Sequence, residues 1–132
     1  MKISGLSNQW KTRDGLFGSF IDGLCDRSDP ILHQRCLAIR RLLESLESID
    51  GPDIWVGTSH QLMHFVLRDA THPFDQVSSF VHAHTYDISA DPPECGYRIG
   101  FSLTGAEWEY TICTDPIDAA KLIERLIRSM SR

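Results

Sequence analysis

The sequence lacks a long hydrophobic run, an apolar segment near its amino terminus and any closely spaced pair of cysteines. A membrane-spanning helix needs about 20 consecutive apolar residues, so none is predicted. The opening stretch, MKISGLSNQWKTRDG, has no apolar core of a secretory signal, and we therefore expect a cytoplasmic protein. The four cysteines form no C-x-x-C pair, which argues against a zinc finger or a thioredoxin-like site and favours reduced thiols.

Positive charge is nearly absent from one long part of the chain. Between Asp69 and Asp118 there are nine acidic residues and a single cation, Arg98, in a chain of formal net charge −5. Because negative charge repels phosphate backbones, this segment is not expected to bind nucleic acid. It suits a basic protein partner, although the same charges can equally serve to keep a surface solvated.

Two helices are indicated by the same local device, an aspartate followed by a proline. Asp29 and Asp115 are suited to cap a helix, and the proline after each is suited to the first helical position. Apolar stripes at helical spacing follow both, ending near residues 50 and 131. A shorter helix is predicted within DGLFGSFIDGLCD, residues 14–26. Arg35 falls in the apolar arc of its helix, where its guanidinium either reaches water or meets a carboxylate.

From residue 54 to residue 114 the apolar pattern changes to a period of two, which is typical of strands. The segments are DIWVG, LMHFVLRD, SFVHAHTYDI, GYRIGFSL and EWEYTIC, with TGAE as a hairpin turn before the last. In GYRIGFSL we predict that the core side holds Tyr97, Ile99, Phe101 and Leu103. In EWEYTIC we predict Trp108, Tyr110 and Ile112 on the core side, and on the solvent side Glu107, Glu109, Thr111 and Cys113.

These elements predict a single α+β domain in two layers. Its antiparallel sheet of four to five strands is expected to carry three helices mainly on one face, in the order α-α-β-β-β-β-β-α. The expected parts are an irregular leader (1–13), a helical part (14–50), the sheet (54–114) and a carboxy-terminal helix (115–131). The second face of the sheet would be left open to solvent or to a partner.

His82 and His84 lie one residue apart in a predicted strand, so both point to the same face. In one register they face the helices with Phe80 and Tyr86; in the other, Val81, Ala83 and Thr85 face in and the histidines lie on the open face. The second register is preferred because burying two imidazoles is costly. His64 would then share their face.

Three histidines on one face, with Glu109 as a fourth ligand or general base, could bind zinc or iron. The pattern matches no specific metal signature such as H-E-x-x-H. A solvated or partner-facing surface, or core histidines satisfied by hydrogen bonds, would explain the same residues.

Three functions are compatible with these observations. The leading hypothesis is a non-enzymatic, acidic protein-binding domain, such as an inhibitor or immunity-type protein, that occludes a basic site. Its expected contact residues are Tyr86, Asp87, Asp91, Glu94, Glu107 and Glu109. The second hypothesis is a small metal-dependent enzyme built on His64, His82 and His84. The third is an oligomeric accessory domain that pairs two copies through Tyr86 and Val66.

Overall fold

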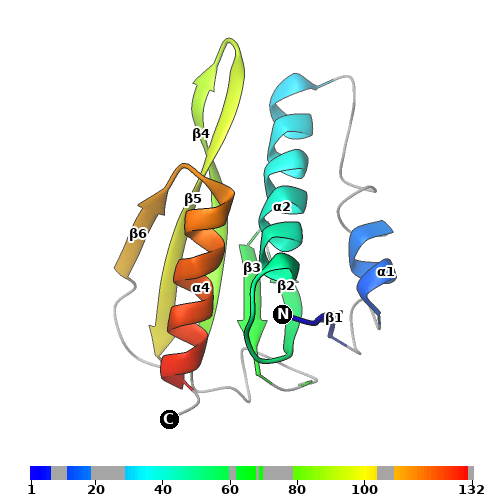
Figure 1. Ribbon diagram of the computed structural model, residues 1–132. Helices are drawn as coiled ribbons and strands as arrows, with labels where there is room; N and C mark the ends of the chain where they lie inside the picture. The colour runs from blue at the N-terminus through cyan, green and yellow to red at the C-terminus, as the bar shows by residue number, and fades with distance from the viewer. Residues whose placement is uncertain are drawn as a thin grey trace.

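Six strands form one mixed sheet in the described part of the chain, and two long helices cover one face of it (Figure 1). The computed structural model describes residues 1–6, 12–18, 29–59, 62–67, 69, 79–103 and 109–130. Along the chain the elements are β1 (Ile3–Gly5), α1 (Arg13–Gly15), α2 (Pro30–Ser48), β2 (Ile54–Ser59), β3 (Leu62–Val66), β4 (Ser79–Ala90), β5 (Pro93–Leu103), β6 (Glu109–Cys113) and α4 (Pro116–Met130).

Both long helices begin where the aspartate–proline pairs predict. Asp29 Oδ1 accepts hydrogen bonds from the backbone N–H groups of Ile31 and Leu32, at 3.0 and 3.2 Å. Asp115 Oδ1 accepts from the N–H groups of Ile117 and Asp118, at 2.7 and 3.2 Å. These bonds satisfy N–H groups that have no partner within the helix, which fixes where each helix starts.

The strands follow one another in the sheet in the order in which they occur in the chain, β1-β2-β3-β4-β5-β6. Neighbours from β2 to β6 are antiparallel, whereas β1 runs parallel to β2 with Ile3 opposite Ile54. The α+β class is therefore confirmed. The expected number of four to five strands was wrong, because the sheet has six. The expectation of a purely antiparallel sheet was also wrong, because β1 is parallel to β2.

The additional strand is β1, which lies inside the segment 1–13 that was expected to be irregular. With three residues it is too short to display a period of two, and its pairing with β2 joins residues far apart in the chain. Parallel neighbours need a long crossover, and α1 and α2 lie within that crossover. The predicted helix over 14–26 is described only to residue 18: Leu16 and Phe17 are buried, and the rest lies outside the described residues.

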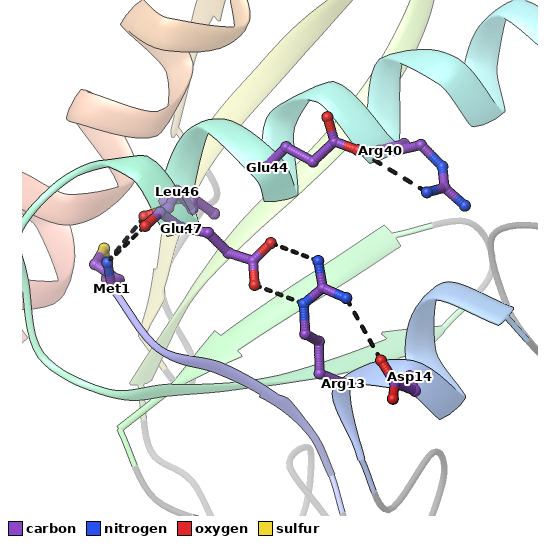
Figure 2. Close-up of polar contacts among 7 residues, drawn as sticks. All are labelled: Met1, Arg13, Asp14, Arg40, Glu44, Leu46 and Glu47. Carbon is purple, nitrogen blue, oxygen red and sulfur yellow. Dashed lines mark hydrogen bonds and ion pairs between the residues drawn. The ribbon is translucent and has the colours of Figure 1, made fainter.

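The amino-terminal segment is tied to the end of α2 (Figure 2). The Met1 ammonium group donates hydrogen bonds to the carbonyl oxygens of Leu46 and Glu47, at 3.1 and 3.4 Å, and also to that of Ile49. The Arg13 guanidinium binds both carboxylate oxygens of Glu47, at 2.6 and 2.9 Å. A cation is favourable at a helix carboxy terminus, where the last carbonyl groups lack partners within the helix.

The main core lies between the sheet and the helices α2 and α4, and we call this side of the sheet the helix face. Val81 and Ala83 of β4, and Tyr97 and Ile99 of β5, lie on it and are buried. The Tyr97 hydroxyl donates a 2.7 Å hydrogen bond to the carbonyl oxygen of Ala38 in α2, so this buried polar group is satisfied. We call the opposite side of the sheet the outer face.

The β4–β5 hairpin is longer than its neighbours and extends past the ends of β3 and β6, beside the first turns of α2 (Figure 1). In β4 the residues after His84 pair with β5 alone, and in β5 the residues before Tyr97 pair with β4 alone, within the described strands. Between His84 and Tyr97 the hairpin therefore has no neighbouring strand on either side among the described strands. A bulge between Asp87 and Ser89 interrupts its register.

Candidate partner-binding surface

The third predicted strand adopts the preferred register. Val81 and Ala83 lie in the core on the helix face, and His82 lies on the outer face directly opposite His64 of β3. The predicted exposure of these histidines was wrong, because the side chains of His64 and His82 are both fully buried. Nearby on the sheet, Val66 is also buried, in a second small cluster with Leu6 and Trp55. Val66 is thus not available to pair two copies.

A glycine explains part of the burial of His82. Gly100 of β5 lies between His82 of β4 and Tyr110 of β6, opposite each of them in its own strand pair. With no side chain at Gly100, the two rings meet across β5, edge to face, with centroids 5.2 Å apart and planes at 74°. Strands two positions apart are separated by about 9.6 Å, so a larger residue at position 100 would keep these rings apart.

Burial also sets the charge of the two histidines. Desolvation, together with a smaller contribution from the nearby charge of His82, lowers the pKa of His64 to about 4. Desolvation lowers the pKa of His82 to about 4 as well, with a smaller effect from His84. His84 is only half-buried, and its pKa is lowered by burial and then by the charges of Arg98 and Arg35. All three imidazoles are therefore neutral near pH 7.

No group of three or more His, Cys, Asp or Glu side chains lies close enough to hold a metal ion within the part of the chain that the structure describes. His64 and His82 are neighbours across β3 and β4, and His84 lies two residues further along β4. Glu109, the predicted fourth ligand, lies in β6, where its backbone pairs with Phe101 of β5. The hypothesis of a metal site at His64, His82 and His84 gains no support from this arrangement.

The predicted orientation of β6 was wrong. Tyr110 and Ile112 are 45% and 60% exposed, whereas Cys113 packs against the main core. The reason is the register with β5, which places Cys113 opposite Tyr97 and Thr111 opposite Ile99, both on the helix face. In a strand, a shift of one residue exchanges the two faces, and the local alternation of EWEYTIC does not determine which face is inward.

Four of the six predicted contact residues come together on the β4–β5 hairpin. Tyr86 and Asp87 lie where its projecting part begins, and Asp91 and Glu94 lie at or near its turn. Glu107 lies outside the described residues, and Glu109 is in β6, away from the hairpin tip. These four residues share one hairpin but not one face, because Asp87 is bound to Arg35 of α2 whereas Tyr86 lies on the outer face.

Asp87 has a structural partner. Its carboxylate accepts hydrogen bonds from Arg35 Nε at 3.0 Å and from Arg35 Nη2 at 2.6 Å, and Cys95 Sγ lies 3.7 Å away. The bond from Arg35 holds the pKa of Asp87 below its usual range, and Asp87 raises the pKa of Arg35. Of the two expectations for Arg35, the carboxylate partner is confirmed. The ion pair between Asp87 and Arg35 joins the hairpin to α2, and the positive charge of Arg35 offsets the negative charge of the Asp87 carboxylate.

Tyr86 lies on the outer face of the hairpin, against Gly96. A Cβ atom at Gly96 would lie 2.8 Å from Cζ of the Tyr86 ring, so the ring occupies the space that a side chain would need. The Arg98 guanidinium carbon lies 5.1 Å from the centroid of that ring, in a cation–π arrangement. The Tyr86 ring is therefore packed against Gly96 and beside Arg98 within the hairpin.

Two residues of this surface were not among the predicted contacts. Ile88, at the bulge, is 46% exposed, and Arg98 is exposed on the outer face of β5. A sequence signal existed for Arg98, since it is the single cation among nine acids between Asp69 and Asp118. None existed for Ile88, because the bulge that exposes it arises from the pairing of two strands.

In comparisons with known proteins, no family model, no curated protein and no solved structure matches this chain. No helix in the described ranges is long and apolar enough to cross a membrane.

Proposed function

We propose that the protein is a protein-binding domain that holds a basic partner with its β4–β5 hairpin. The hairpin projects beyond its neighbouring strands (Figure 1). The observation that supports this proposal is the composition of the projecting end, where Asp91 in the turn, Glu94 just after it and Ile88 just before it are all exposed. An apolar side chain surrounded by charges of one sign is suited to a partner with a basic rim around an apolar pocket. Occlusion of a basic site, as by an inhibitor, would follow from such binding.

The hairpin is joined to α2 on one face and packed within itself on the other before it meets a partner. On the helix side, the two hydrogen bonds between Arg35 and Asp87 join it to α2. On the outer side, the Tyr86 ring lies against Gly96 and beneath Arg98. An element that is ordered in advance loses less conformational entropy on binding, so a larger part of its contact energy appears as affinity.

The charges of the hairpin tip support a fast approach of a basic protein. Asp91 and Glu94 are exposed, and the whole chain has a formal net charge of −5. Opposite charges on two proteins raise their association rate, and salt reduces the effect. We therefore expect the association rate, more than the dissociation rate, to depend on these two acids.

The first experiment identifies the partner by position. A photoreactive benzoylphenylalanine at position 88, expressed in cells of the source organism, would be crosslinked and the product identified by mass spectrometry. A second protein with the same group at Lys121, an exposed residue of α4, serves as the matched control. A basic protein joined at position 88 and not at position 121 is expected.

The second experiment measures binding of that protein by surface plasmon resonance at several salt concentrations. In Asp91→Lys/Glu94→Lys the association rate is expected to fall by about tenfold or more and to lose its salt dependence. Asp50→Lys/Asp53→Lys changes the net charge equally at exposed positions after α2, and we expect it to have a much smaller effect. Equal effects of the two double variants, or crosslinking that does not distinguish positions 88 and 121, would contradict the proposal.

A further inference from the structure

The outer face of β5 carries a short strip of two charged residues, Glu94 and Arg98, separated by a glycine. Cys95 and Tyr97 contact the main core, so by alternation Glu94, Gly96, Arg98 and Gly100 lie on the outer face. The two glycines have no side chain. Between positions 94 and 100, Glu94 and Arg98 are therefore the only β5 side chains that project from this face.

Among the described residues, neither charge of this strip has an ion-pair partner. Glu94 and Arg98 are both exposed. They lie four residues apart on one strand, about 13 Å along its axis, and so cannot pair with each other. The Arg98 guanidinium instead lies 5.1 Å from the Tyr86 ring, which leaves its hydrogen-bond donors available.

The strip is complementary to itself. A twofold axis over Gly96, parallel to the sheet and perpendicular to β5, would bring two copies together with their outer faces in contact and their β5 strands antiparallel. Such an axis places Arg98 of each copy opposite Glu94 of the other, because the two residues are equidistant from Gly96. Both ion pairs would then form at once, and no like charges of the strip would meet.

We propose that the outer face of the hairpin is an interface with a second copy of this chain, in which Arg98 of each copy binds Glu94 of the other. The centre of the contact is Tyr86, whose ring covers Gly96 and lies on the axis, so the rings of the two copies meet there. Tyrosine and arginine are the residue types that most often dominate the binding energy of an interface. The structure thus places a fixed aromatic anchor between two charge pairs.

This inference goes beyond the proposed function, and the two share one residue. Glu94 would bind Arg98 of the second copy in the dimer and the basic partner in the complex. The two forms of binding therefore compete, and a basic partner is expected to dissociate the dimer. The charge-exchange experiment below separates them, because exchanging two charges restores an interface between identical copies but not one with a different protein.

The test is sedimentation equilibrium of the purified full chain over a wide range of concentration. We expect a monomer–dimer equilibrium for the wild type. Arg98→Glu and Glu94→Arg each bring like charges together twice in the dimer, and each should raise the dimer dissociation constant by at least about tenfold. The double variant, Arg98→Glu with Glu94→Arg, recreates both pairs in reverse and should return the dissociation constant close to that of the wild type.

Matched controls are available at exposed positions away from the hairpin. Lys121→Glu in α4 and Asp53→Arg before β2 make the same changes of charge, and neither should alter the dissociation constant beyond the small effect of net charge. Circular dichroism of every variant establishes that the fold is retained. A wild-type chain that stays monomeric at every concentration would overturn the inference, as would a dimer that the single reversals leave intact or the double variant fails to restore.

Discussion

Acid is expected to destabilise this fold through two buried histidines, at a pH well above that at which carboxylates titrate. His64 and His82 are fully buried, and burial lowers the pKa of each from 6.5 to about 4. In the unfolded chain each imidazole regains its ordinary pKa. The unfolded state therefore binds more protons than the folded state between these values, and stability falls as the pH is lowered through 6.5 toward 4.

The size of the effect follows from the two pKa values. For one histidine with pKa 6.5 unfolded and about 4 folded, the free energy of unfolding at pH 5 is lower by about 2 kcal/mol than at pH 8. Two such groups give about 4 kcal/mol, which is a large part of the 5–15 kcal/mol that is typical of a whole domain. The charge of His82 also lowers the pKa of His64, so the two contributions are coupled.

The assay is urea unfolding, followed by tryptophan fluorescence at these two pH values, for the wild type and for His64→Gln/His82→Gln. The quantity compared is the difference in unfolding free energy between the two pH values, because the structural cost of the substitutions cancels from it. The double variant should retain only a minor part of the wild-type difference, including that of His84, whose pKa is also lowered.

Ile99→Val is the control, since it weakens the core without removing a titratable group. It should lower stability equally at both pH values and leave the difference unchanged. A wild-type stability that is the same at pH 5 and pH 8 would refute the reasoning, and so would a double variant that keeps the full difference. Asp87 does not confuse the result, because its lowered pKa affects stability only at more acidic pH.

Two further predictions concern the anchoring of the hairpin. The side chains of Arg35 and Asp87 are 32% and 35% exposed, so their ion pair is partly screened by water. A double-mutant cycle with Arg35→Gln and Asp87→Asn, measured by urea unfolding, should give a coupling free energy of about 1 kcal/mol. A coupling free energy indistinguishable from zero would contradict the anchoring role. Gly96→Ala should cost about 1 kcal/mol or less, because its Cβ atom would lie 2.8 Å from the far end of the half-buried Tyr86 ring, which would have to move aside. In a Tyr86→Ala background the same substitution should cost much less, and an unchanged cost would show that the ring is not the obstacle.

The features that the sequence predicted well are those determined by neighbouring residues. The starts of α2 and α4 follow from an aspartate, a proline and an apolar stripe, all within a few turns of the chain. The register of β4 was also predictable, because Val81 and Ala83 are apolar and the histidines beside them are costly to bury in the main core.

The features that the sequence did not predict depend on pairing between distant residues. β1 is recognisable only through its parallel pairing with β2, and the facing of β6 only through its register with β5. In the candidate surface, the bond from Arg35 to Asp87 joins residues 52 positions apart. The burial of His82 in part depends on Tyr110, which reaches it from a strand two positions away.

The parallel pairing of β1 with β2 also has a consequence for the order in which the fold can assemble. Each strand from β2 to β5 pairs with the next along the chain, so those contacts close comparatively short loops. Strand β1 is synthesised before its neighbour and must wait until α2 and the first residues of β2 have followed it. During translation, β1 is therefore the strand that waits longest for its pairing partner. Its pairing with β2 also raises the contact order of a sheet whose other strand pairs are local in the sequence.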